Sequence, residues 1–146
     1  MGTQPTSTEI VVRGVLRKGG MILACRAKAR GHLFLPGGHL EFGEKAREAL
    51  EREWMEEMGV ECAAGRFLGV AEQVYRSASG VETHEMSLVF KVRCAALRPP
   101  APVEGIEGHV RFEWIPEGGL AAAGVLPAKL AGAVGEWLAG RGGGFA

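Results

Sequence analysis

One segment of this chain predicts a long amphipathic helix between two stretches that favour strands. From about residue 44 to residue 58 the sequence has a helical pattern, with Leu50, Trp54 and Met58 recurring four residues apart. Side chains at this spacing lie on one face of a helix and form an apolar stripe. Gly59 follows, where a left-handed residue commonly ends a helix. We therefore expect a helix over 44–58 that packs its apolar stripe against a core.

Three carboxylates crowd the margin of the same helix. Glu53, Glu56 and Glu57 are spaced i, i+3 and i+4, so their side chains are neighbours. Like charges at these spacings repel by roughly 0.2–0.5 kcal/mol per pair. A divalent cation would turn the repulsion into shared attraction, because Mg²⁺ prefers oxygen ligands. The alternative reading is a solvated acidic face, which is common on helices.

Before this helix, the residue pattern predicts strands and a glycine-rich turn. Residues 10–16 and 21–26 are expected to form a hairpin around a Gly19-Gly20 turn, followed by a short strand near 33–35. The turn Pro36-Gly37-Gly38 then leads into the helix. Glycines let a backbone approach a ligand closely, and a helix N-terminus favours phosphate.

After the helix, two long β-rich segments, 65–77 and 83–95, are predicted to form a hairpin with its loop near 77–82. The Pro- and Gly-rich residues 97–109 predict a loop. A last strand is expected at 110–115. Pro127 is expected to open a closing helix that reaches about residue 138 and buries Leu130, Val134 and Leu138. This order of elements indicates an α+β fold, with helices covering a curved sheet.

Length and composition predict one globular domain. The chain has 146 residues, and its 17 basic residues balance 17 acidic ones, so no overall charge attracts nucleic acid. We expect a disordered tail over 1–7, a single domain over 8–140 and a flexible Gly-rich C-terminus over 141–146. The three scattered cysteines favour reduced thiols and a cytoplasmic location. No apolar run approaches the roughly 20 residues needed to span a membrane.

The segment from Gly38 to Val60 resembles the Nudix box, GX5EX7REUXEEXGU, in which U is a bulky aliphatic residue. All seven fixed positions match, and they are Gly38, Glu44, Arg52, Glu53, Glu56, Glu57 and Gly59. One departure is Trp54 at the first U position, which lies on the apolar stripe and leaves the carboxylates untouched. The box covers about a sixth of the chain. The resemblance implies the Nudix fold, a mixed β-sheet between helices in an α/β/α arrangement.

The resemblance also implies a reaction. Nudix enzymes hydrolyse a nucleoside diphosphate linked to another moiety, with Mg²⁺ or Mn²⁺, when water attacks phosphorus. Carried over, Glu56 and Glu57 would be metal ligands, with Glu53 as a ligand or the general base. The carbonyl of Gly37 would be a further ligand. Arg52 would orient Glu53 by a charge-assisted hydrogen bond.

The remaining roles leave alternatives open. Glu44 is expected to brace Arg52 or the glycine-rich loop. In some family members the base is a loop glutamate outside the box, and here Glu104 and Glu107 are the candidates, with Glu85 the weaker one. Gly38, Tyr75 and Phe34 are predicted to contact substrate.

The resemblance does not identify the substrate. Between Gly59 and Arg98 there is no proline, so the downstream proline typical of many ADP-ribose-cleaving relatives is missing. A small nucleoside diphosphate derivative is the expected partner, without membrane or nucleic acid, and the family's habit of dimerising implies a homodimer. The alternative function is a Nudix-fold domain that senses a nucleotide without cleaving it. Such domains usually lose box carboxylates, and this chain keeps them, which favours the enzyme.

Overall fold

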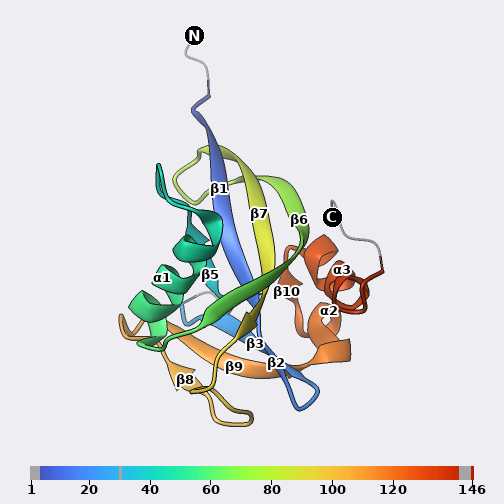
Figure 1. The fold of residues 1–146 in the computed structure, drawn as a ribbon. Helices are drawn as coiled ribbons and strands as arrows, with labels where there is room; N and C mark the ends of the chain where they lie inside the picture. The colour runs from blue at the N-terminus through green and yellow to red at the C-terminus, as the bar shows by residue number, and fades with distance from the viewer. Residues whose placement is uncertain (1–3, 30, 142–145) are drawn as a thin grey trace.

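The computed structural model describes residues 4–29, 31–141 and 146, and these form two β-sheets flanked by helices (Figure 1). The first sheet has the strand order β5–β1–β7–β6. Its strands are β1 (Thr6–Val15), β5 (Gly37–His39), β6 (Ala63–Arg76) and β7 (Glu82–Arg93). The long β1 runs parallel to β7 over ten residue pairs and antiparallel to β5. The predicted mixed sheet is therefore present, and it carries the glycine-rich turn on one edge.

The second sheet has the order β10–β4–β3–β9–β8, with β2 also paired to β3. Its strands are β2 (Arg17–Lys18), β3 (Met21–Ala27), β4 (Leu33–Phe34), β8 (Val103–Glu104), β9 (Val110–Pro116) and β10 (Val125–Leu126). In Figure 1, helix α1 (Ala46–Met58) covers one side of the sheets. The opposite side holds η1 (Glu117–Gly119), α2 (Leu120–Ala123) and α3 (Ala128–Leu138).

The hydrophobic core has two parts, one under each group of helices. Under α1 it includes Leu50, Trp54 and Met58, which are all buried as the apolar stripe predicts. Under α2 and α3 it includes Leu130 and Val134. Leu138 is only half-buried, and Trp137 fills the adjacent core position instead. Both amphipathic helices thus bury the faces that hold the sheets together.

Close packing fixes the position of α1 on the first sheet. Strand β1 passes beneath Trp54 at Gly14, where a Cβ would lie 2.7 Å from Val92 Cγ2 and 2.8 Å from Trp54 Cζ2. The indole Nε1 of Trp54 also donates to the carbonyl of Pro36, 3.3 Å away. Glycine at position 14 therefore lets the helix lie close to the strand, while the indole ties the helix to the glycine-rich turn.

The predicted hairpin of 10–16 with 21–26 is wrong in its pairing. Strand β1 ends at Val15 and belongs to the first sheet, and the short β2 alone folds back on β3 through Gly19 and Gly20. Both glycines have positive φ, which such a tight turn requires. A local pattern could not reveal that β1 pairs with β7, since the two strands are separated by more than sixty residues.

Other boundaries also differ from the predictions. The first helix begins at Ala46, so Glu44 precedes it, and β8 lies in the expected loop 97–109. Strand β1 begins at Thr6, inside the expected tail, whose first three residues lie outside the described part of the chain. At the other end, 142–145 are also outside it, and the backbone of Ala146 pairs with Val70 and Glu72. Within the described residues, no helix is long and apolar enough to cross a membrane.

Candidate active site

Arg52 is the centre of an ion-pair network on α1. Its Nε and Nη2 donate to the two carboxylate oxygens of Glu44, at 2.6 and 3.0 Å. Its Nη1 donates to Glu53, at 3.0 Å, and to Glu56, at 3.1 Å. The hydrogen bond from Arg52 holds the pKa of Glu44 below its usual range. The expected contacts of Arg52 with Glu44 and Glu53 are therefore present, and one guanidinium holds three carboxylates.

The glycine-rich turn packs directly against this network. Arg52 Nη2 donates to the carbonyl of His39, 3.2 Å away, and the backbone N–H of Glu41 donates to Glu44 Oε1 at 3.2 Å. A Cβ on Gly38 would lie 2.3 Å from Glu53 Cδ. Gly38 was predicted to contact substrate, and the structure gives it a second reason to be glycine. Only a residue without a side chain lets Glu53 lie against this turn.

Gly37 is required by the strand pairing. A Cβ at this position would lie 1.8 Å from the carbonyl oxygen of Val12 and 3.0 Å from the Cα of Arg13. Since these neighbours are backbone atoms of β1, no side-chain rotation could relieve the clash. The glycine therefore fixes the close approach of β5 to β1, and with it the position of the turn beside Glu53.

Glu57 stands apart from the Arg52 network and is half-buried. Burial raises its pKa to about 7, and the negative charges of Glu53, Glu107 and Glu56 act in the same direction. The positive charge of Arg13 partly offsets this effect. A carboxylate so destabilised in its charged form would gain from a nearby cation. This is the charge environment that the crowded helix face predicted.

The loop between β8 and β9 brings one of the two loop glutamates to this site. The backbone N–H of Ile106 donates to the carbonyl of Glu57, at 2.9 Å, and so ties the loop to the end of α1. Glu107 follows directly, and its charge acts on Glu57. Glu104 instead pairs with Lys28 at 2.6 Å, which lowers its pKa. Of the two candidate bases, Glu107 is thus the one whose charge reaches the α1 carboxylates.

In the described part of the chain, no three His, Cys, Asp or Glu side chains come together as they would around a metal ion. The reason lies in Arg52, toward which Glu53 and Glu56 both turn. The donor set still fits a hard divalent cation, because three carboxylates leave neighbouring positions of one helix. Glu53 is held in place, with 15% of its side chain exposed, whereas Glu56 is 56% exposed and has room to rotate.

Arg13 links the α1 carboxylates to a cavity of about 560 Å³. It lines the cavity, its backbone pairs with Gly37 of the glycine-rich turn, and its positive charge acts on Glu57. The cavity lining also includes Phe34, Tyr75 and Glu85. Arg13 Nη1 donates to the carbonyl of Leu35 at 3.1 Å, and its guanidinium lies 5.4 Å from the centre of the Phe34 ring. Phe34 and Tyr75, predicted to contact substrate, therefore lie together in one cavity that shares Arg13 with the Glu57 environment.

Sequence reasoning missed Arg13 and gave Glu85 only a minor role. The sequence contains a signal for each residue. Arg13 interrupts the apolar run of β1, and Glu85 occupies one of the alternate positions of β7 whose side chains face inward. Both signals depend on knowing which strand face points inward. His39 and His84 pair outside the cavity, with His39 2.9 Å from Glu9 and His84 2.6 Å from Glu72, whereas His32 is one of the residues that line it.

The model of the NUDIX domain matches residues 7–134, which is most of the chain. The chain belongs to the Nudix family. Its Nudix box runs from Gly38 to Val60 and supplies the last residue of the glycine-rich turn, the Arg52 network and Glu57.

One relative of this Nudix protein is an ADP-ribose pyrophosphatase from Methanocaldococcus jannaschii, 36% identical over 84 residues. These residues are 56% of this chain and 48% of the relative, so the match spans about half the relative's length. Two solved structures share the fold. A MutT protein from Methanosarcina mazei Go1 has a TM-score of 0.71 and 21% identity, covering 96% of this chain and 98% of that one. A NUDIX hydrolase from Nitrosomonas europaea has a TM-score of 0.68 and 15% identity, covering 100% and 81%.

Proposed function

We propose that this protein is a metal-dependent pyrophosphohydrolase that acts on a nucleoside diphosphate linked to another moiety. The observation that supports the proposal is the position of the α1 carboxylates relative to two arginines and a cavity. Arg52 holds the box carboxylates Glu44, Glu53 and Glu56, while Glu57 is influenced by a second arginine, Arg13, which also lines a cavity. The cavity suits the organic part of a nucleotide, and Arg13 suits its diphosphate.

Glu56 and Glu57 would hold a magnesium or manganese ion, with Glu53 and the carbonyl of Gly37 as further ligands. Such an ion, when bound, would neutralise the charge of the diphosphate and polarise its phosphoryl oxygens. The half-buried Glu57 supports this assignment, because its neighbouring negative charges and its burial all disfavour an uncompensated carboxylate.

The reaction requires water to attack one phosphorus atom while the bridging P–O bond breaks and a base accepts the water proton. Glu53 supports the role of base through its fixed orientation between Arg52 and Gly38. Glu107 is the alternative, since it lies on a loop anchored to Glu57 and is exposed to solvent. Glu104 is a weaker candidate than Glu107, because its carboxylate is engaged by Lys28.

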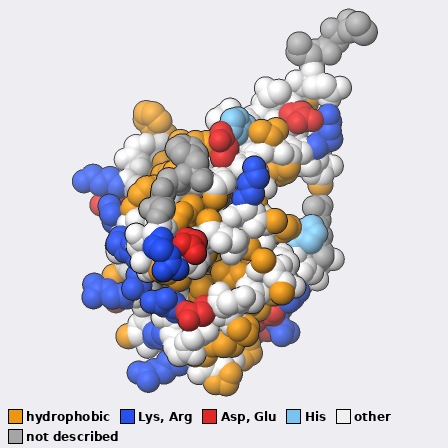
Figure 2. All heavy atoms as spheres, turned by 90° about the vertical axis from the view of Figure 1, so that its right-hand side faces the viewer, with side chains coloured by type: hydrophobic (Ala, Val, Ile, Leu, Met, Phe, Trp, Pro, Cys, Tyr) orange, Lys and Arg blue, Asp and Glu red, His pale blue; other side chains and the backbone are white. Residues whose placement is uncertain are grey.

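The substrate class is a small nucleotide derivative. The relative named as an ADP-ribose pyrophosphatase makes ADP-ribose one candidate, although the proline typical of many such enzymes is missing between Gly59 and Arg98. On the face shown in Figure 2, basic side chains are interspersed with acidic and hydrophobic ones, which does not favour nucleic acid. A homodimer and a cytoplasmic location are further predictions from the sequence.

The proposal is tested with a panel of ADP-ribose, UDP-sugars, dinucleoside polyphosphates and nucleoside triphosphates, each with Mg²⁺ or Mn²⁺. Glu57→Gln is the inactive variant, and Glu48→Gln, at an exposed position of the same helix, is the matched control. We expect at least one compound to be cleaved at its phosphoanhydride by the wild type and by Glu48→Gln, with loss of about 100-fold or more in Glu57→Gln.

Two results would contradict the proposal. Equal activity of Glu57→Gln would place the chemistry elsewhere. Nucleotide binding without turnover of any compound would favour a sensor domain, the alternative that the complete set of carboxylates argues against. Calorimetric titration with Mg²⁺ or Mn²⁺ in the presence of ADP then reports whether an ion binds at all.

A further inference from the structure

The cavity lined by Arg13 also contains a buried carboxyl group that the proposed reaction does not use. Among the described residues, the buried polar side chains are Thr83, Glu85 and Ser87, three alternate residues on one face of β7. Glu85 is the charged member, with 5% of the residue exposed, and it lines the cavity. Burying a carboxylate is unfavourable unless it is paired and hydrogen-bonded. The position of Glu85 therefore needs a reason.

The partners of Glu85 hold it in place without saturating it. Its Oε1 accepts from Ser87 Oγ at 3.1 Å and from Gln73 Nε2 at 3.4 Å. Its Oε2 accepts from Tyr75 Oη at 3.4 Å, and Arg13 Nη2 lies 3.8 Å from Oε1. An ionised carboxylate offers about four acceptor sites, and three of these contacts are long. Oε2 in particular has capacity for further donors.

A purely structural ion pair in this chain looks different. Arg26 donates to Glu113 through two nitrogens, at 2.6 and 3.1 Å, in a fork that engages both carboxylate oxygens. Glu85 has no such fork, although it is the more buried of the two carboxylates. A carboxylate selected only to neutralise Arg13 would be expected to meet it as closely as Glu113 meets Arg26.

The other residues that line the cavity indicate which chemical group could donate further hydrogen bonds to Glu85. Phe34 and Tyr75 line the cavity, and so does Arg13, whose backbone pairs with Gly37 in the glycine-rich turn beside Glu53, where the proposed diphosphate site begins. A group in this cavity would therefore be one attached to the diphosphate. Because an ionised carboxylate only accepts hydrogen bonds, it favours paired donors and repels acceptors. Guanine offers adjacent N1–H and N2–H groups, and a sugar offers a vicinal diol.

We propose that Glu85 is a specificity-determining residue that accepts two adjacent hydrogen-bond donors from the group attached to the diphosphate. The cavity thereby selects a guanine edge or a vicinal diol over a group that presents acceptors at the same place. This inference rests on the proposed function for the existence of a diphosphate substrate. Glu85 would select the substrate, whereas the α1 carboxylates would take part in the reaction.

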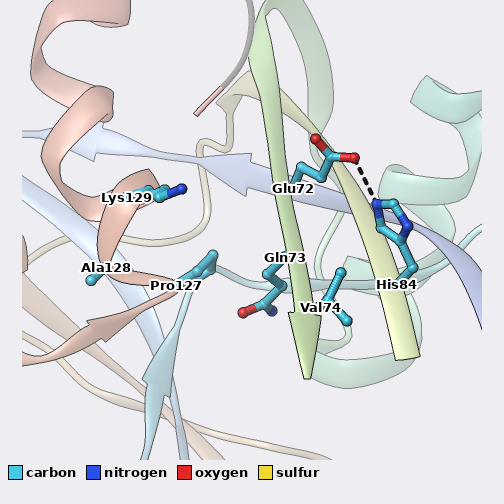
Figure 3. A pocket seen from close by; sticks show the side chains of 7 residues that line it. All are labelled: Glu72, Gln73, Val74, His84, Pro127, Ala128 and Lys129. Carbon is cyan, nitrogen blue, oxygen red and sulfur yellow. Dashed lines mark hydrogen bonds and ion pairs between the residues drawn. The ribbon is translucent and has the colours of Figure 1, made fainter. Parts of the chain in front are cut away.

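The test measures binding separately from turnover, with GDP, IDP, ADP and 2′,3′-dideoxyadenosine diphosphate as probes. IDP lacks the guanine amino group, so the comparison of GDP with IDP tests donors on the base. The dideoxy compound lacks the diol, so its comparison with ADP tests donors on the sugar. Glu85→Gln keeps the shape of the side chain but replaces one acceptor oxygen with a donor. Glu72→Gln is the matched control, because its carboxylate pairs with His84 (Figure 3) and neither of these two residues lines the cavity that contains Glu85.

We expect the wild type to prefer GDP over IDP, or ADP over its dideoxy analogue, by about 10- to 100-fold. Glu85→Gln should abolish that preference while changing the affinity for the poorer partner less than about 3-fold, and Glu72→Gln should retain it. Thermal unfolding of each variant checks that the fold is intact.

Either preference, lost in Glu85→Gln, supports the inference and identifies the source of the donors. No preference in the wild type, or an equal loss of affinity for all four probes in Glu85→Gln, would overturn it. The proposed function fails independently. Hydrolysis with an unchanged preference in Glu85→Gln overturns only this inference, whereas a Glu85-dependent preference without hydrolysis overturns only the enzyme.

Discussion

The half-buried Glu57 makes the stability of the metal-free protein depend on pH in a specific direction. Its pKa is raised from 4.5 to about 7 by burial and by the charges of Glu53, Glu107 and Glu56. Between these two values, the unfolded chain releases a proton that the folded chain keeps. Rising pH therefore favours the unfolded state through Glu57, until the folded state also ionises above about pH 7. The full difference corresponds to ~3 kcal/mol.

Replacing Glu57 by Gln removes this contribution with little change in shape. In urea denaturation with EDTA, we expect the free energy of unfolding of Glu57→Gln, relative to wild type, to rise by about 2–3 kcal/mol between pH 5 and pH 8. Glu48→Gln, exposed on the same helix, should follow the wild type at both pH values. Comparing variants at each pH cancels the titration of the other groups.

Addition of Mg²⁺ at pH 8 should then stabilise the wild type more than Glu57→Gln, because a ligand of the folded state stabilises it by RT ln(1 + [L]/Kd), which grows as the affinity increases. A difference between Glu57→Gln and wild type that does not change with pH would refute the reasoning. It would mean that Glu57 is solvated and is ionised at the same pH in both states.

Three further substitutions test the packing around the site. Gly38→Ala places a Cβ 2.3 Å from the Glu53 carboxylate carbon, so kcat/KM should fall about 100-fold. The free energy of unfolding, measured by urea denaturation, should change by less than ~1 kcal/mol. Unchanged turnover would contradict the role of this glycine. Trp54→Ala empties a fully buried site and should lower the free energy of unfolding by ~3–5 kcal/mol, a value near zero being incompatible with the core described above. Gly14→Ala inserts a methyl 2.7 Å from Val92 and should cost ~1–3 kcal/mol in the same assay, whereas a more stable variant would show that helix and strand separate easily.

The features of the site that the sequence predicted are local. The apolar stripe of Leu50, Trp54 and Met58 and the neighbouring carboxylates follow from helical spacing, which needs no knowledge of the rest of the fold. The contact of Arg52 with Glu56 also follows from helical spacing, since the two residues are four positions apart, whereas the contact with Glu53 was implied by the resemblance to the Nudix box.

The features that it did not predict depend on strands far apart in the chain. Alternation assigns a residue to one face of a strand, but it does not name the neighbouring strand. The cavity gathers Arg13 from β1, Phe34 from β4, Tyr75 from β6 and Glu85 from β7, and no local pattern links these four. Short elements such as β8, β10 and α2 were missed because two to four residues are too few to show a period.

The guanidinium of Arg52 has a consequence for folding in the absence of a metal ion. By contacting Glu44, Glu53 and Glu56 together, it acts as a built-in counter-ion, so these acidic residues do not depend on an external cation for folding. The chain can therefore complete this part of its structure without metal. If an ion binds as proposed, Glu56 would exchange the guanidinium for the ion, while Glu44 would keep Arg52 in position.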